Sequence, residues 1–361
     1  MDKDKISMRQ MLVLLFAALL SPAVRVLPAR TGTAAGRAGW LSALAALPVL
    51  LALCWGIFLL FRKSEGGDGM SRVYQRVLGR GLGRLVTWLY LAWGMVLLGC
   101  NLRLFGLRFL STSYRNAPMP LFITALLLLA LWLTWKRLGT LARAGQVFYL
   151  ALAIGLGAVL LLGTTRVELS HVLPLWTEDL PAVVRSAAPV LSVLGYTIYG
   201  AFLGGSITRG EEDQAQTMKW GAAFCLVLTA LQWICLGSFG PELTRRMEAP
   251  FFMMVKGVGV EGAFERVESV IIALWVLSDL ALIALLLSAC SRMAGDMLSL
   301  RQENYAAPVL AAGALAGALW AVPDTFALYT WMERVVLPGN LLFGFLLPGA
   351  ALLSGWMRKL L

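Results

Sequence analysis

The chain has 361 residues, of which 59% are hydrophobic and 14% are charged, and its mean hydropathy is +0.76. A soluble protein of this length could not bury so much apolar surface in one core, so the composition indicates a polytopic membrane protein. The net charge of +11 does not by itself indicate nucleic-acid binding. We expect no nucleic-acid partner, because membrane topology accounts for most of this charge.

Ten apolar stretches follow one another along the chain, and each is long enough to cross a bilayer, in some cases with tilt. Backbone polar groups in lipid must be satisfied within the segment, so we predict an all-α protein with ten transmembrane helices. The ten divide as a 5+5 inverted repeat within one integral membrane domain over residues 1–361, with halves at about 9–164 and 186–357. The stretches are 9–36, 39–61, 84–109, 119–137, 143–164, 186–208, 217–239, 266–290, 306–322 and 335–357.

The distribution of Lys and Arg predicts the orientation of these helices. If the N-terminus is cytoplasmic, the inner segments hold 18 of the 31 basic residues and the outer segments hold 10. Cytoplasmic segments carry the excess of Lys and Arg, so both termini are predicted to be cytoplasmic. The basic segment Gly79–Arg84 resembles a phosphate-binding loop, but it lacks the Lys-Ser/Thr ending, and we interpret it as an interfacial loop.

The first helix of each half carries residues that interrupt a helix. Ser21-Pro22 interrupts the first stretch, and glycines from Gly195 onward follow a proline in the sixth. In inverted-repeat transporters these two helices are broken and the substrate lies at the breaks. We therefore predict two broken helices with a ligand between them, although close packing at the glycines and a simple kink at Pro22 remain alternatives. The candidate ligand-binding residues at the breaks are Ser21, Pro22, Ala23, Val24, Leu194, Gly195, Tyr196 and Thr197.

Charged residues inside the apolar stretches are further candidates, because they are costly in lipid. Asp279 lies in the middle of the eighth stretch, and we add it and Arg103 to the ligand-binding candidates. Direct ligand contact by Asp279 and a structural pairing with Arg103 or Arg25 both remain open. Arg108 is expected to extend to the outer interface. Arg25 could pair with an acidic ligand, pair with Asp279, or face the outer vestibule.

Metal and cofactor sites are not expected. The five cysteines lie in apolar stretches without a CxxC pair, and the chain has one histidine, His171. Paired acids, histidine clusters and a Ser/Lys arrangement are missing from the stretches, so an intramembrane enzyme is not expected either.

Three segments resemble one known family. They are "KISMRQMLVLL" at 5–15, "LPARTGTAAGRAGWLS" at 27–42 and "APFFMMVKGVGVEGAFERVESVIIALWVLSD" at 249–279. The chain resembles the B subunits of GerA-type spore germinant receptors, the spore-permease branch of the amino acid–polyamine–organocation superfamily. Six residues are in register with the third pattern: Pro250, Lys256, Glu265, Arg266, Glu268 and Trp275. We take the first five of them as gating or motif residues.

The resemblance implies a LeuT/APC-like fold in the spore inner membrane that senses a small nutrient, an amino acid in the first instance, between helices 1 and 6. It also implies an A-type membrane subunit and a C-type lipoprotein subunit as partners. The family usually has Gly-Thr at the break of helix 1, where this chain has Ser21-Pro22. An ion-coupled amino acid or polyamine transporter of the same fold is the alternative, because fold alone does not decide function.

Overall fold

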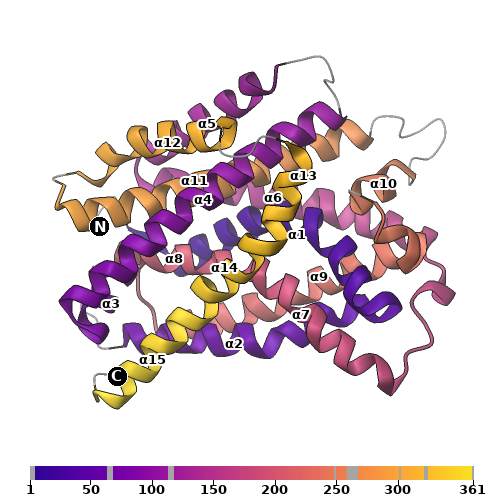
Figure 1. Ribbon diagram of the computed structural model, residues 1–361, viewed down its shortest axis with the longest axis horizontal. Helices are drawn as coiled ribbons and strands as arrows, with labels where there is room; N and C mark the ends of the chain where they lie inside the picture. The colour runs from indigo at the N-terminus through magenta and orange to yellow at the C-terminus, as the bar shows by residue number, and fades with distance from the viewer. Residues whose placement is uncertain are drawn as a thin grey trace.

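The computed structural model describes residues 5–62, 68–112, 118–247, 249–257, 267–300, 302–320 and 324–359. Within these residues the chain is almost wholly helical, as Figure 1 shows. Seven helical segments of the described part are long and apolar enough to cross a membrane, and the first of them, Met8–Phe61, contains two helices in succession. The chain is therefore built as an integral membrane protein.

The first half contains the five predicted helices and one short helix more. Arg80 begins α4, so our interpretation of Gly79–Arg84 as a loop is wrong except at Gly79, whose φ of +91° ends the preceding helix. The elements are α1 (Met8–Ala35), η1 (Gly36–Leu41), α2 (Ser42–Phe61), α3 (Met70–Leu78), α4 (Arg80–Thr112), α5 (Met119–Trp135) and α6 (Leu138–Gly163).

The second half begins after three short 3-10 turns: η2 (Thr164–Arg166), η3 (Leu169–His171) and η4 (Thr177–Asp179). Its last helical run starts at Thr325, ten residues before the predicted start, and contains two π-helical turns. The elements are α7 (Leu180–Leu194), η5 (Gly195–Thr197), α8 (Ile198–Phe202), η6 (Gly204–Ser206), α9 (Asp213–Thr244), α10 (Pro250–Gly257), α11 (Val267–Leu298), η7 (Glu303–Ala306), α12 (Ala307–Trp320), α13 (Thr325–Trp331), η8 (Met332–Val336), α14 (Leu337–Leu341), η9 (Leu342–Leu346) and α15 (Leu347–Met357).

Two short strands, which the sequence did not predict, join the N-terminus to the end of the sixth helix. Strand β1 (Ile6–Ser7) pairs in parallel with β2 (Ile207–Thr208), with Ile6 opposite Ile207. Ser7 then caps α1, because its hydroxyl accepts the N–H of Gln10. The start of α1 is thereby fixed to the segment that follows α8.

Helix α1 lies at the centre of the bundle. It packs against α6, α7, α9 and α11, and Figure 1 shows it in indigo between the other helices. A helix that is apolar on all sides is suited to such a position. The last helical run, from α13 to α15, crosses the front of the molecule in yellow, and α5 and α12 pack together at one edge.

The interruption of the sixth helix is present, whereas that of the first is smaller than predicted. Between α7 and α8, residues Gly195–Thr197 form a 3-10 turn. Helix α1 stays helical from Met8 to Ala35 through both of its prolines, so the prediction of a fully broken helix 1 is corrected. Its disturbance is local, because the N–H of Ser21 donates to Ser278 Oγ (2.8 Å), which itself donates to the Ala17 carbonyl (2.5 Å). Ser278 thus joins two groups that pair directly in a regular helix.

Candidate functional site

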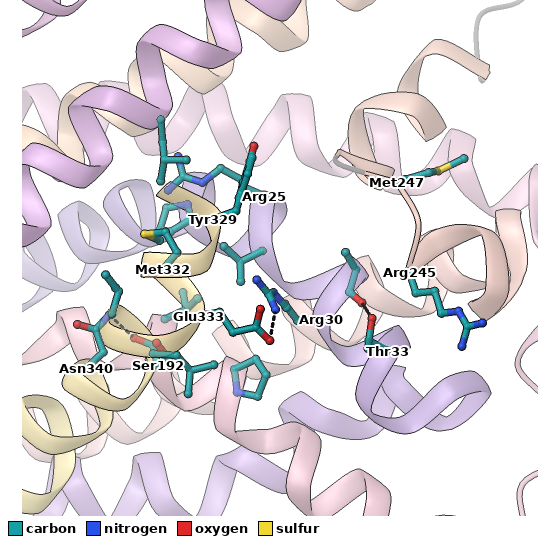
Figure 2. Close-up of a pocket in the computed structure, with 18 of the residues that line it drawn as sticks. Arg25, Arg30, Thr33, Ser192, Arg245, Met247, Tyr329, Met332, Glu333 and Asn340 are labelled. Carbon is teal, nitrogen blue, oxygen red and sulfur yellow. Dashed lines mark hydrogen bonds and ion pairs between the residues drawn. The ribbon is translucent and has the colours of Figure 1, made fainter. Parts of the chain in front are cut away.

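A cavity of about 450 Å³ lies between the C-terminal half of α1, the α7–η5 junction and the last helical run. We call it the Arg25 cavity. Its walls include Pro22, Arg25 and Ala29 of α1, Tyr196 of η5, Tyr329 of α13 and Asn340 of α14. Figure 2 shows Arg25, Tyr329 and Asn340 around the cavity, on helices that lie far apart in the sequence. A concave site with a few convergent polar groups is the usual form of a small-molecule site.

A chain of hydrogen bonds joins α1, α4 and η5 along one wall of the cavity. Arg25 Nη2 donates to Asn101 Oδ1 (2.8 Å), and Asn101 Nδ2 donates to the hydroxyl of Tyr196 (3.0 Å). Asn101 is 1% exposed. Asn340 Nδ2 donates to the Ser192 carbonyl (3.0 Å), a bond that joins α14 to α7 and that Figure 2 marks with a dashed line. These bonds fix the polar groups that face the cavity.

The rim of the Arg25 cavity is charged. Arg30 of α1 pairs with Glu333 of η8 at 2.7 Å, and the dashed line in Figure 2 marks this pair across the cavity. Arg245, just after α9, pairs with Glu242 at 2.6 Å. The lining residues contain four arginines and one glutamate, so their charge is net positive. Such a cavity favours anionic ligands.

A second polar cluster, buried in the core, joins α1, α4 and α11. Asp279 is 2% exposed and pairs with Arg108 at 3.4 Å. The Ser21 hydroxyl donates to Asp279 (2.5 Å) and accepts from Arg108 (3.2 Å), while the guanidinium of Arg108 lies 4.8 Å from the centre of the Trp275 ring. The structure thus gives each charge an oppositely charged partner.

This cluster corrects three expectations about charges in the spans. The partner of Asp279 is Arg108, and neither Arg103 nor Arg25 pairs with it. Arg108 therefore points into the core and does not extend to the interface. Arg103 donates instead to the carbonyl oxygens of Ala318 and Leu319, at the end of α12, where the helix dipole favours a cation.

The candidates from helices 1 and 6 lie in different surroundings. Of the eight, Pro22 and Tyr196 line the Arg25 cavity. Ser21 belongs to the buried cluster, and Thr197 lines a separate cavity of about 250 Å³ near the N-terminus of α1. Gly195 packs on the backbone of the last helical run. The others are fully buried apolar residues: Ala23, Val24 and Leu194.

The motif residues lie away from the cavity or outside the described part. Pro250 begins the short helix α10, and the ammonium of Lys256 lies 4.7 Å from the ring centre of Phe252. Glu265 and Arg266 fall outside the described residues. Glu268 is in the first turn of α11, and its side chain is likewise outside the description.

Asn101 and Asn340 were missed by the sequence analysis, although a signal for them exists. Each is an uncharged polar residue within a long apolar stretch, and such residues are buried only when they are hydrogen-bonded. Within the residues that the structure describes, no group of three His, Cys, Asp or Glu side chains could hold a metal ion.

A sequence model of the spore permease family, described as "Spore germination protein", matches residues 5–321. The chain belongs to this family of spore germination proteins. This spore permease is 26% identical over 284 residues to spore germination protein KB of Bacillus subtilis (strain 168), in an alignment that covers 74% of the chain and 72% of that protein. The resemblance inferred from the sequence is confirmed.

Three solved transporter structures share the fold of the spore permease. They are a Na+-coupled sialic acid symporter in a substrate-bound outward-open state (TM-score 0.65, covering 95% of this chain and 79% of that chain), MhsT in complex with L-phenylalanine (0.66, 98% and 89%), and MHP1, a nucleobase-cation-symport-1 family transporter (0.69, 99% and 80%). Each is 13% identical, so the likeness shows the fold alone. It confirms the LeuT/APC-like fold class, while the count of ten crossings stays a prediction. Family and fold neighbours are germination proteins and transporters, which agrees with a protein that is not an enzyme.

Proposed function

We infer that this spore permease is the nutrient-sensing B subunit of a germinant receptor and that a small molecule, an amino acid in the first instance, binds in the Arg25 cavity. The observation that carries this proposal is the position of the cavity. It lies where Pro22 of the kinked first helix faces Tyr196 of the interrupted sixth helix. In folds of this kind, ligands bind between these two helices.

The receptor would lie in the spore inner membrane with both termini cytoplasmic. Helix α1 runs from Met8 to Ala35, and the Arg25 cavity lies along its C-terminal half, so a cytoplasmic N-terminus places the cavity on the outer side. An incoming nutrient would reach it there. An A-type membrane subunit and a C-type lipoprotein subunit are the proposed partners, in keeping with the family.

Ion-coupled transport is the second candidate, and the three transporter neighbours are the observation that favours it. The partners of the buried carboxylates argue against ion-coupled transport. Two acidic residues are buried in the described part of the chain, Asp279 and Asp213. Asp279 is neutralised by Arg108, and Asp213 accepts the N–H of Gly210 at the start of α9. The carboxylate in the core, Asp279, is thus already paired with a cation, which supports sensing.

Binding would act through a shift between two conformations. The cavity walls come from α1, η5 and α14, so a ligand that contacts all three favours the conformation in which they are closest. It can shift the equilibrium only by the difference between its affinities for the two states. Helix α1 is the element that would transmit the change, because it also contacts α6, α9 and α11.

The test is the stoichiometry of binding to proteoliposomes of the purified protein, with each labelled amino acid in turn and an imposed Na⁺ or proton gradient. The blocking variant is Ala29→Trp, because Ala29 lines the cavity, and the matched control is Ala34→Trp, on the exposed side of the same helix. We expect saturable binding near one molecule per protein that is independent of the gradient, lost in Ala29→Trp and kept in Ala34→Trp.

Accumulation of many molecules per protein that collapses with the gradient would show a transporter and overturn the sensing function. If the isolated subunit binds none of the amino acids, the measurement is repeated with co-expressed A-type and C-type subunits. Absence of binding in that complex would reject an amino acid as the ligand.

A further inference from the structure

We propose that the ligand of the Arg25 cavity carries a carboxylate and that the guanidinium of Arg25 binds it. This inference rests on the proposed sensing function and specifies the chemical class of the ligand. It begins from the arginines of the cavity, whose partners differ. Arg30 pairs with Glu333, and Arg245 pairs with Glu242, so both have a carboxylate. Arg25 donates to Asn101, which is neutral.

The guanidinium of Arg25 is incompletely satisfied. Its Nε and Nη1 atoms are buried and have no hydrogen-bond partner, while Nη2 is held by Asn101. Each unsatisfied buried donor carries a desolvation cost, and that cost is larger for a charged group. Nε and Nη1 lie on different edges of the guanidinium, and a carboxylate binds one edge through two parallel hydrogen bonds, here from Nε or Nη1 together with the second N–H of Nη2.

The charges around Arg25 make an anion more favourable still. Arg108 donates to Ser21, which lies one helical turn before Arg25 on α1, so two positive charges lie along one face of this helix. The carboxylate in this region, Asp279, already serves Arg108. Within the described residues Arg25 therefore has no carboxylate partner, although it lies at membrane depth, where an uncompensated charge is costly. A bound carboxylate would complete a second pair.

The position of Arg25 relative to the cavity makes this binding sterically feasible. Arg25 lines a cavity of about 450 Å³, which is ample for a molecule the size of an amino acid. Nε and Nη1 are buried, so binding requires the Arg25 side chain, which already lines the cavity, to turn these donors toward the ligand. Because Asn101 also contacts Tyr196, an anion at Arg25 would be linked through hydrogen bonds to the turn η5.

The experiment compares acetate with acetamide, two molecules of nearly the same shape that differ in charge. Apparent unfolding midpoints of the full-length detergent-solubilised protein are measured in 100 mM of each at matched ionic strength. We expect acetate to raise the midpoint of the wild-type protein by about 2 °C relative to acetamide. Arg25→Gln should abolish this difference, and Arg25→Lys, which keeps the charge without the planar fork, should retain part of it.

Arg37→Gln is the matched control, because Arg37 is an exposed arginine beside the end of α1 and does not line the cavity. It should keep the full acetate effect. Equal midpoints of the wild-type protein in acetate and acetamide would overturn the inference, and so would an acetate effect that survives in Arg25→Gln. The outcome is separable from the sensing function: gradient-driven accumulation in proteoliposomes would reject sensing and leave a positive acetate result intact.

Discussion

The buried pair of Arg108 and Asp279 gives a quantitative prediction for Asp279→Asn. The charged groups lie 3.4 Å apart, and the two side chains are 14% and 3% exposed. At an effective dielectric constant of about 20, unit charges at this distance attract by about 5 kcal/mol. The substitution removes that attraction and leaves a buried guanidinium opposite an amide. We expect the free energy of unfolding to fall by about 3–5 kcal/mol.

The contribution of the pair is isolated by a double-mutant cycle with Arg108→Gln. The double variant has no buried charge at this position, so it should be less destabilised than the sum of the two single variants. We expect a coupling energy of at least about 2 kcal/mol. The assay is titration with sodium dodecyl sulfate in mixed micelles, followed by circular dichroism at 222 nm.

Arg103→Gln supplies the control cycle for Asp279→Asn. Arg103 lies on α4, the helix that carries Arg108, but it donates to the carbonyls at the end of α12 and does not contact Asp279. The two substitutions should be additive to within about 0.5 kcal/mol. Additivity in the Arg108 cycle, or equal coupling in both cycles, would refute the reasoning.

Three further predictions concern packing, the rim and the kink. Gly195→Ala places a Cβ 2.7 Å from the carbonyl oxygen of Asn340, so we expect a loss of about 1–3 kcal/mol in unfolding free energy. Gly157→Ala, inside α6, meets nothing within 4 Å and should not lower the unfolding free energy in the same titration. Glu333→Gln should lower the unfolding free energy by less than about 1 kcal/mol, because the ion pair of Glu333 with Arg30 of α1 is partly exposed. A loss of several kcal/mol would contradict this. Ser278→Ala removes the hydroxyl that joins two backbone groups of α1 and should cost about 1–2 kcal/mol; unchanged stability and unchanged amide exchange in α1 would show that the bridge is unimportant.

The sequence by itself determined the class of protein, the approximate positions of most of the helices and the family. These properties follow from local rules, because an apolar run in lipid must satisfy its own backbone and therefore becomes a helix. The interruption at Gly195 could also be predicted, since a proline followed by glycines weakens a helix wherever it lies. The prolines of α1 show the limit of that rule. Surrounding helices keep α1 helical through both of them, and Ser278, 257 residues away, supplies a bond at the kink.

Only the tertiary structure decided which charges meet. Arg103 and Arg108 lie five residues apart on one helix, yet one caps the end of α12 and the other pairs with Asp279, 171 residues away. The tertiary structure also formed the Arg25 cavity, whose walls come from both halves of the chain. It placed Asn101 beside Arg25, where two guanidinium donors remain without a partner. Pairing in the core depends on the direction in which each helix face points after packing. The sequence of a single segment gives the position of a charge along its helix. The partner of that charge is set by how the neighbouring helices pack against it.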